Sequence, residues 1–296
     1  MSGRWRRQLV VAVAVALVVV GWAGAFARAQ APAPVSASPG VAPGAVLDRA
    51  AQAEFLRSAK VIRSQTLSTG VTSPYRLTLT DGTVTHDASF QSVNERASQA
   101  NFGARGVEFN FADSHHFNLA AFQMAGMLGL DGMMPVTVHR IWNGKDGTVT
   151  WWLDDVFDER TRLKEKRQAP NPVTWSQQLN KMRVFAALVG DTDRNAGNIL
   201  IGTADWKVWM IDFTRAFRLA DSLKAPETLT QIDRTLLARL RALDATAVRA
   251  ATVHCLSTFE AAAVMKRRDA LVAHFDRLVA EKGAGAVLYG AEPKAP

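Results

Sequence analysis

The hydrophobic pattern of the chain changes near residue 155, and this change limits the folds that the chain can adopt. Residues 75–93 (YRLTLTDGTVTHDASFQSV) alternate apolar and polar side chains around an Asp-Gly turn at 81–82, which is typical of a β-hairpin. A helical stretch covers 115–130 (HHFNLAAFQMAGMLGL), and a second hairpin covers 136–156. The first half of the domain is therefore predicted to be hairpin, helix, hairpin.

The second half is predicted to be mainly helical. Three stretches carry apolar side chains at helical spacing: 175–189, 229–243 and 258–281. The exception is ILIGTADWKVWMIDF at 199–213, which consists of two short apolar strands joined by a turn. We therefore predict an α+β fold of two lobes, a β-rich N-terminal lobe at residues 47–155 and a mainly helical C-terminal lobe at 156–290, with a cleft between them.

The N-terminal 29 residues have the layout of a secretory signal. A basic cluster at 4–7 precedes an uncharged apolar run at 9–27, and small residues around Ala29 provide a cleavage site. The apolar run is also long enough to stay in the bilayer as an anchor. Both alternatives predict an exported domain, periplasmic or extracellular, that contacts a membrane only through an uncleaved N-terminal segment. Residues 30–46 are rich in Pro, Ala, Ser and Gly and are predicted to form a linker.

The composition of the chain limits how the domain can be stabilised and which kinds of ligand it favours. The single cysteine, Cys255, cannot form an intramolecular disulfide, so the domain must be stabilised by its core. The net charge of +8 suits anionic ligands such as nucleotides or phospholipid headgroups, but the arginines are scattered. We expect no nucleic-acid partner and a monomer. The sequence contains no internal repeat and no Cys/His spacing typical of metal sites.

The stretch DTDRNAGN at 191–198 places acidic and amide side chains at spacings that phosphoryl transfer requires. That chemistry needs a carboxylate that orients the acceptor, a metal-binding amide about five residues later, and a second metal-binding carboxylate on the next hairpin. Asp193 and Asn198 are five residues apart, and Asp212 follows fourteen residues later, after two short strands that return the chain. The alternative is that the acidic residues only terminate a helix, as Asp and Asn do in turns. The combined spacing favours a site.

These motifs carry a family resemblance. GDTDRNAGNILI at 190–201 and WMIDFTRAF at 209–217 resemble the catalytic and metal-binding loops of the atypical kinases, a group that includes phosphatidylinositol 3- and 4-kinases, secretory-pathway kinases and HipA-like kinases. The sequence looks most similar to exported bacterial proteins of that type. The resemblance covers roughly residues 75–285, although only the two loop motifs are specific, and it implies a two-lobed protein-kinase-like fold.

The resemblance also implies roles for individual residues. Asp193 would be the catalytic aspartate, and Arg194 and Asn195 would shape the catalytic loop around the cofactor. Asn198 and Asp212 would be the metal ligands. The implied cofactors are Mg²⁺ or Mn²⁺ and ATP or another nucleotide.

The upstream lobe departs from the family pattern. Kinases of this kind keep a strand lysine that holds the α- and β-phosphates, and a helix glutamate that pairs with it. The corresponding positions hold Gln91 and Asn118, two neutral residues that can hydrogen-bond but supply no positive charge. Arg76, Arg96 or Arg105 could supply a cation to the nucleotide site from another position, and we favour Arg96 and Arg105 because they lie between the strand of Gln91 and the helix.

Two functional hypotheses follow. In the first, the protein is an exported phosphotransferase that acts on a hydroxyl of a protein, a lipid or a small molecule. In the second, it is a pseudokinase-like binding module of the cell envelope, catalytically weak or inactive. The complete set of Asp193, Asn198 and Asp212 favours the first, while Gln91, Asn118 and the predicted compartment favour the second. An unrelated envelope-binding protein is a third alternative, which requires the loop match to be chance.

Two other residue groups are expected to be structural. His115 and His116 begin a predicted helix, where we expect a capping or solvated role and no metal binding. Most of the tryptophans are expected to pack in the core.

Overall fold

The structure is a computed structural model that describes residues 47–67, 74–103 and 106–291. The predicted signal or anchor at 1–29, the predicted linker at 30–46 and Arg105 lie outside the described residues. Of the helices in the described part of the chain, none combines the length and the apolar character needed to cross a bilayer.

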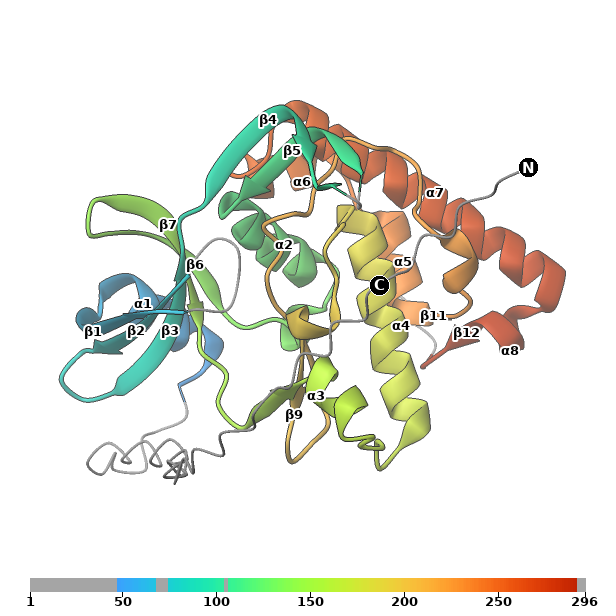
Figure 1. Ribbon diagram of the computed structural model, residues 1–296. Coiled ribbons are helices and arrows are strands. Elements are labelled where there is room, and N and C mark those ends of the chain that lie inside the picture. Colours follow the sequence, from blue (N-terminus) through green and yellow to red (C-terminus); the bar gives the residue numbers. More distant parts are fainter. Residues whose placement is uncertain (1–46, 68–73, 104–105, 292–296) are drawn as a thin grey trace, which may run out of the picture. The chain divides into compact units, whose positions relative to one another are not determined.

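The N-terminal half is built on a five-stranded antiparallel sheet (Figure 1). In spatial order its strands are β1 (Lys60–Thr66), β2 (Tyr75–Thr80), β3 (Thr85–Gln91), β7 (Lys145–Trp151) and β6 (Thr137–Trp142). Both predicted hairpins are confirmed: β2 pairs with β3 and β6 pairs with β7. The carboxylate of Asp81 shapes the first turn by accepting from the backbone N–H groups of Thr83 and Val84, each at 2.8 Å.

Helix α1 (Arg49–Ser58) covers this sheet and completes a small hydrophobic core. Phe55 and Leu56 of the helix pack with the inward-facing side chains of the strands. Arg140 of β6 fastens the end of the helix by donating to the carbonyls of Leu56 and Ala59, at 2.8 and 2.7 Å. The sequence analysis did not predict this helix, nor β1.

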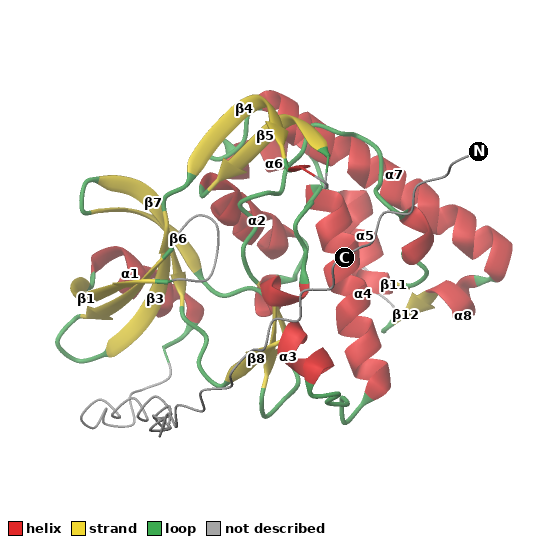
Figure 2. Ribbon diagram, viewed as in Figure 1, coloured by secondary structure: helices red, strands yellow, loops and turns green. Residues whose placement is uncertain are grey.

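A third hairpin, β4 (Asn94–Asn101) and β5 (Val107–Ser114), is inserted between β3 and helix α2 (His116–Met127). Its two strands pair only with each other in the sheets of the described chain. In Figures 1 and 2 this hairpin leaves the sheet and lies over the helices of the C-terminal half. Ion pairs hold it there: Arg96 to Glu260 at 2.8 Å, and Glu108 to both Arg215 and Arg218.

Helix α2 was predicted correctly, but the role of His115 at its start was not. His115 is only 1% exposed and makes no side-chain capping hydrogen bond. Burial lowers the pKa of His115 to about 4, so its imidazole is neutral at physiological pH. The expectation of a capping or solvated role is therefore wrong for His115, because the β6–β7 hairpin covers this end of the helix.

The C-terminal half is mainly helical, as predicted (Figure 2). Its elements are β8 (Val156–Asp158), α3 (Glu159–Lys164), α4 (Pro172–Val189), η3 (Ala196–Asn198), β9 (Ile199–Gly202), β10 (Val208–Met210), η4 (Pro226–Thr228), β11 (Ile232–Asp233), α5 (Arg234–Ala242), α6 (Ala245–Thr252), α7 (Thr258–Lys282), α8 (Ala284–Val287) and β12 (Leu288–Tyr289). The helix predicted at 229–243 begins only at Arg234. Asp233 caps it, and the preceding residue Ile232 is held in a short parallel pair with Leu288.

The larger hydrophobic core joins α2 to the helices of the C-terminal half. Phe117, Ala121 and Met124 of α2 are fully buried in the same cluster as Phe185 of α4 and Phe275 of α7. Helix α2 therefore packs against the helical half while its N-terminal end contacts the sheet. Helix α2 therefore contacts both the sheet and the segments between α4 and α5.

A buried arginine ties α7 to the end of α4. Arg267 is 1% exposed and donates to the carbonyls of Leu188 (2.8 Å), Arg218 (2.6 Å) and Ala220. Burial lowers the pKa of Arg267 to about 10, but the guanidinium stays charged at neutral pH. These carbonyls belong to the chain on both sides of the predicted site, so α7 fixes both sides.

We predict that Arg267→Met destabilises the fold. The substitution fills much of the same space but leaves buried carbonyl oxygens unpaired, and each such acceptor costs about 1–3 kcal/mol. The free energy of unfolding, measured by urea titration, should fall by at least about 2 kcal/mol. Lys266→Met is the control: its ion pair with Asp221 is largely exposed, so stability should change by less than about 1 kcal/mol. Equal effects of the two substitutions would contradict this role for Arg267.

Candidate active site

The loop after α4 carries the predicted catalytic residues. The helix ends at Gly190, whose left-handed backbone (φ 59°) turns the chain sharply into the loop. The Asp191 side chain is completely buried and accepts from the backbone N–H of Asp193 at 2.9 Å. Asp191 therefore shapes the loop from inside, and Asp193 lies at its turn.

Arg194 joins this loop to the segment around Asp212. Its guanidinium pairs with Asp191, with Nε 2.8 Å from Oδ2. The same group donates to three backbone carbonyls, those of Asn198 (2.7 Å), Ile211 (2.6 Å) and Asp212 (3.3 Å). It also lies over the ring of Phe213, 4.1 Å from the centroid. Every donor that a substrate could use is engaged with the protein, so we assign Arg194 a positioning role.

The two asparagines of the loop have different environments. Asn195 caps the short helix η3 by accepting from the N–H of Gly197 at 2.8 Å, and its amide also donates to Asp193. Asn198 donates its side-chain amide to the carbonyl of Asp193 at 2.9 Å. Among the described residues, no hydrogen bond reaches the amide oxygen of Asn198. Asn195 therefore shapes the loop, whereas Asn198 keeps an oxygen for a ligand.

Strands β9 and β10 bring Asp212 beside Asn198. They pair so that Met210 lies opposite Ile199, and the N–H of Ile211 donates to the carbonyl of Asn198 at 3.2 Å. Asp212 itself has a left-handed backbone (φ 56°), a conformation that is uncommon outside glycine. Its Oδ1 accepts from the hydroxyl of Thr214 at 3.1 Å, which holds the carboxylate in place.

Gln91 and Asn118 meet, as predicted, and together reach Asp212. The amide of Asn118 donates to Oε1 of Gln91 at 2.6 Å, and Nε2 of Gln91 is 3.5 Å from Oδ1 of Asp212. On its other side, Oδ1 of Asn118 accepts from the backbone N–H of Phe213 at 2.7 Å. A neutral relay of two amides therefore links β3, α2 and the Asp212 segment. By the resemblance described above, these are the positions expected for a lysine–glutamate pair, and the relay carries no charge.

The predicted replacement cations are engaged elsewhere. Arg96 pairs with Glu260 at the start of α7, and Arg76 pairs with Asp87 at 2.6 Å and stacks on Trp152. Arg105 is not among the described residues. Arg160 of α3 lies close to the loop that carries Asp193 and Asn198. The sequence analysis did not single out this arginine. A Cβ added to Gly197 would lie 2.6 Å from its Nη2.

Within the described part of the chain, Arg160 forms no ion pair within 4.0 Å, although the charge of nearby Asp158 acts on it electrostatically. Its guanidinium is therefore a cation beside the loop that a bound anion could use. No local sequence pattern indicates this residue, because its proximity to Gly197 depends on how α3 packs against η3.

Asp113 adds a second buried carboxylate near Asp212. It lies on β5, is 8% exposed, and its Oδ1 has no hydrogen-bond partner among the described residues. Burial raises the pKa of the Asp113 carboxyl; the hydroxyl of Thr214 opposes this shift, and the negative charge of Asp212 adds to it. The carboxylates around Asp212 therefore create a negative potential that favours a cation.

No protein-family model and no curated protein matches the sequence, but solved structures match the fold. The structure of hydra Fam20 with sugar aligns with a TM-score of 0.64, over 83% of this chain and 93% of that chain, at 14% identity. The Golgi casein kinase with Mn/ADP bound aligns with a TM-score of 0.61, over 83% and 80%, at 14% identity. The Helicobacter pylori proinflammatory kinase CtkA aligns with a TM-score of 0.50, over 76% and 98%, at 11% identity.

The chain has an atypical kinase-like fold. The predicted α+β architecture of two lobes is thereby confirmed, since these alignments cover most of the chain. At such low identities the likeness concerns the fold alone. The chemistry of the kinase-like site must be argued from its own residues.

The oxygen donors of this kinase-like site suit a hard divalent cation. Asn198 Oδ1 receives no hydrogen bond from a described residue, and the same is true of Asp212 Oδ2. Carboxylate and amide oxygens are the ligands that Mg²⁺ and Mn²⁺ prefer. The two residues therefore fit the predicted metal site, and phosphate oxygens and water would complete the coordination.

A cavity of about 760 Å³ adjoins Asp193 on the side of the β4–β5 hairpin. Its walls include Glu108 and Phe109 of the hairpin, Arg215 and Arg218 after Asp212, and Lys224. The inserted hairpin, which the sequence analysis did not predict, therefore builds one wall of the space next to the predicted catalytic aspartate.

We predict that Arg194→Lys disrupts the kinase-like site although it keeps the charge. A lysine has three donors on a flexible stem and cannot satisfy four acceptors spread over two loops. The melting temperature should fall by about 4 °C or more, since hydrogen bonds to charged groups contribute about 1.5–3 kcal/mol each. Arg183→Lys is the control, because Arg183 donates one 3.2 Å hydrogen bond from the surface of α4. If the two variants melt alike, Arg194 does not hold the loops together.

Proposed function

We propose that this protein is a phosphotransferase that transfers the γ-phosphate of a nucleotide to a hydroxyl acceptor. The observation that carries the proposal is the convergence of Asp193, Asn198 and Asp212 through the bonds of Arg194 and the pairing of β9 with β10. Residues with the spacing required for phosphoryl transfer are held rigidly, and the oxygen atoms suited to a cation receive no protein donor. The kinase-like fold supports the same conclusion.

The proposed reaction assigns each residue one task. Asp193 orients the acceptor hydroxyl and receives its proton as the new bond forms between the acceptor oxygen and γ-phosphorus. At the same time the bond between that phosphorus and the β–γ bridging oxygen breaks, and the nucleoside diphosphate departs. Asn198 and Asp212 hold Mg²⁺ or Mn²⁺, which when bound offsets the charge of the phosphate oxygens. The Golgi casein kinase structure with Mn/ADP bound supports this choice of cofactors.

The acceptor would enter through the cavity beside Asp193. The cavity has polar and cationic walls from Arg215, Arg218 and Lys224, and an exposed aromatic side chain, Phe109. Its volume of about 760 Å³ can admit a peptide side chain, a sugar or a lipid headgroup. We also propose that the acceptor is met outside the cytoplasm, on the basis of the predicted signal or anchor at residues 1–29.

A second function is favoured by the neutral relay. Gln91 and Asn118 provide no positive charge for the α- and β-phosphates, which is expected of a pseudokinase-like binding module of the cell envelope. The two functions make different demands on the site, because the first needs both metal-dependent nucleotide binding and transfer.

We predict that ATP with Mg²⁺ or Mn²⁺ raises the melting temperature and that the effect requires Asp212. Ligand at 100 times its Kd stabilises a protein by about 2.7 kcal/mol, which corresponds to a rise of roughly 5–10 °C. The titration should compare ATP, GTP and ADP, each with and without metal, and Asp212→Asn should abolish the metal-dependent part. Asp276→Asn is the matched control, since Asp276 lies on the surface of α7 and pairs with Arg241.

Transfer should be followed in parallel as the release of nucleoside diphosphate by the wild type and by Asp193→Asn. Binding with release that requires Asp193 supports the phosphotransferase. Binding without release supports the binding module. If neither nucleotide nor metal stabilises the wild type, both assignments of the site fail.

We predict that Gln91→Lys combined with Asn118→Glu raises nucleotide affinity by about 10-fold, because a charge-assisted contact to phosphate is stronger than a neutral one. The Glu carboxylate can still accept from the N–H of Phe213, and it balances the new lysine. Asn118→Glu alone is the control: it adds a negative charge near the phosphates and should lower the affinity. Affinities are measured by titration calorimetry with the metal held constant.

The same measurement tests Arg160 as the substitute cation. Arg160→Gln should lower the affinity of the wild type by several-fold and have a smaller effect in the double variant, where the lysine supplies the charge. Identical losses in the two backgrounds would show that Arg160 and the relay position act independently.

A further inference from the structure

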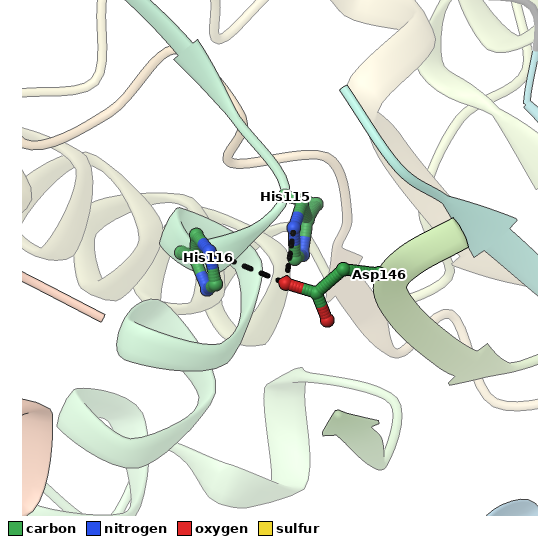
Figure 3. A group of neighbouring side chains, drawn as sticks. All are labelled: His115, His116 and Asp146. Atoms are coloured by element: carbon green, nitrogen blue, oxygen red, sulfur yellow. Dashed lines mark ion pairs between the residues drawn. The ribbon is translucent and has the colours of Figure 1, made fainter. Parts of the chain in front are cut away.

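Three of the chain's six histidines gather around one carboxylate outside the kinase-like site. His115 and His116 lie at the start of α2, His139 lies on β6, and Asp146 lies at the beginning of β7. Figure 3 shows the His115 and His116 rings side by side, with the carboxylate of Asp146 pointing toward both. The cluster therefore joins the helix to the β6–β7 hairpin.

His115 and His116 lie too far from Asp146 for direct hydrogen bonds. Nε2 of His115 and Nε2 of His116 lie 3.7 and 3.8 Å from the same oxygen, Oδ2 of Asp146. A separation above about 3.5 Å is not a hydrogen bond. The candidate donor atoms of the three residues nevertheless all lie within 4.8 Å of one another. Two imidazoles and a carboxylate oxygen therefore converge without bonding to one another.

This spacing is close to that of a tetrahedral metal site. With zinc–ligand distances of about 2.0–2.2 Å, neighbouring ligand atoms lie roughly 3.3–3.6 Å apart. Asp146 and His116 are 52% and 27% exposed, so small rotations of these two side chains can bring the ligand atoms from the observed separations to the tetrahedral ones. Imidazole nitrogen with carboxylate oxygen is a donor set that suits Zn²⁺, whereas Mg²⁺ prefers oxygen alone.

His139 holds the carboxylate of Asp146 on the side away from His115 and His116. Its Nε2 bonds to Oδ1 of Asp146, the oxygen that does not approach the other two histidines. This contact fixes the carboxylate plane and leaves Oδ2 directed toward His115 and His116. Metal-binding side chains are commonly held in this way by a hydrogen bond on the far side from the ion.

The burial of His115 is an independent observation that points to a ligand. The side chain is 1% exposed, yet its Nδ1 has no hydrogen-bond partner among the described residues and its Nε2 reaches only Asp146 at 3.7 Å. Buried polar groups in folded proteins nearly always have a partner. The nitrogen that faces Asp146 therefore has no partner within hydrogen-bonding distance among the described residues, and a cation could bind it.

We propose that His115, His116 and Asp146 bind Zn²⁺ and that the ion fastens the start of α2 to the β6–β7 hairpin. Solvent reaches the site past Asp146, which gives the ion an entry path and leaves a fourth position for water. His139 is a positioning residue in this arrangement.

The site has a consequence for the segment around Asp212. His116 lies two residues before Asn118 on α2, and Asn118 holds both Gln91 and the backbone of Phe213. An ion that restrains the first turn of α2 therefore restrains the relay that reaches Asp212. Zinc binding itself does not depend on the proposed phosphotransfer, so the two can be tested separately.

The test uses tag-free protein that has been stripped with a chelator. Titration calorimetry with Zn²⁺ should show one site per chain, and excess Zn²⁺ should raise the melting temperature by roughly 5 °C. Asp146→Asn and His116→Gln should each weaken binding at least about 10-fold, and His139→Gln should weaken it less. Both primary positions are partly exposed, so these variants are expected to fold. Backbone hydrogen exchange in the first turns of α2 should slow when Zn²⁺ is added.

Two control variants locate the ion. Asp154→Asn removes the His86–Asp154 pair, another exposed histidine–carboxylate contact of the same half, and should leave zinc affinity unchanged. Asp212→Asn should also bind Zn²⁺ as the wild type does, which separates this site from the kinase-like one. The proposal is overturned if the wild type binds no Zn²⁺, if Asp146→Asn and His116→Gln bind it as tightly as the wild type, or if bound Zn²⁺ leaves exchange in α2 unchanged.

Discussion

The guanidinium of Arg194 is the interaction on which the candidate active site depends. It donates hydrogen bonds to one buried carboxylate and to three backbone carbonyls. These acceptors belong to two segments of the chain that are separated by the β9–β10 hairpin. A planar fork with five donors is the side chain best suited to satisfy acceptors in such an arrangement. The positions of Asp193, Asn198 and Asp212 depend on this side chain. Asp193 is its neighbour in the chain, and the backbone carbonyls of the other two residues accept hydrogen bonds from it. The left-handed backbone of Asp212 is tolerated because hydrogen bonds to its carbonyl and its carboxylate hold this conformation.

The amide relay shows that the geometry of a charged pair can be kept without its charges. Asn118 and Gln91 hold helix and strand together at 2.6 Å and reach both Asp212 and the next backbone amide. The helix, the sheet and the segment around Asp212 thus remain coupled. The relay supplies no positive charge, and the carboxylate of Asp113 lies near that of Asp212. In the proposed phosphotransferase, the charge of the phosphates would be balanced by a metal ion and by a cation from outside the relay, and Arg160 lies beside the loop.

Local sequence signals predicted the parts of this architecture that local rules govern. The Asp-Gly turn, the alternation around it and the helical stripe of α7 correspond to observed elements. The segments that carry Asp193, Asn198 and Asp212 are joined by Arg194 and by the pairing of β9 with β10, while the catalytic and metal-binding roles of these residues stay predictions. The β4–β5 hairpin was missed because β4 (NERASQAN) carries no large apolar side chain and shows no alternation, although β5 begins with an alternating run, VEFNF at 107–111. The burial of His115 and the approach of Arg160 to Gly197 depend on packing between distant segments, which no spacing along the chain encodes.

The inserted hairpin also affects how the two halves can move. The sheet is joined to the helical half by the chain between β7 and β8, by the relay of Gln91 and Asn118, and again through β4–β5, whose ion pairs reach Glu260, Arg215 and Arg218. Because these attachments lie at separate places, a movement of the sheet relative to the helices must stretch or break at least one of them. Among the charges of the hairpin's ion pairs, Arg96 is 53% exposed whereas Glu260 is only 3% exposed. Salt would therefore weaken the attachment only in part, and the hairpin would restrain the two halves even at high ionic strength.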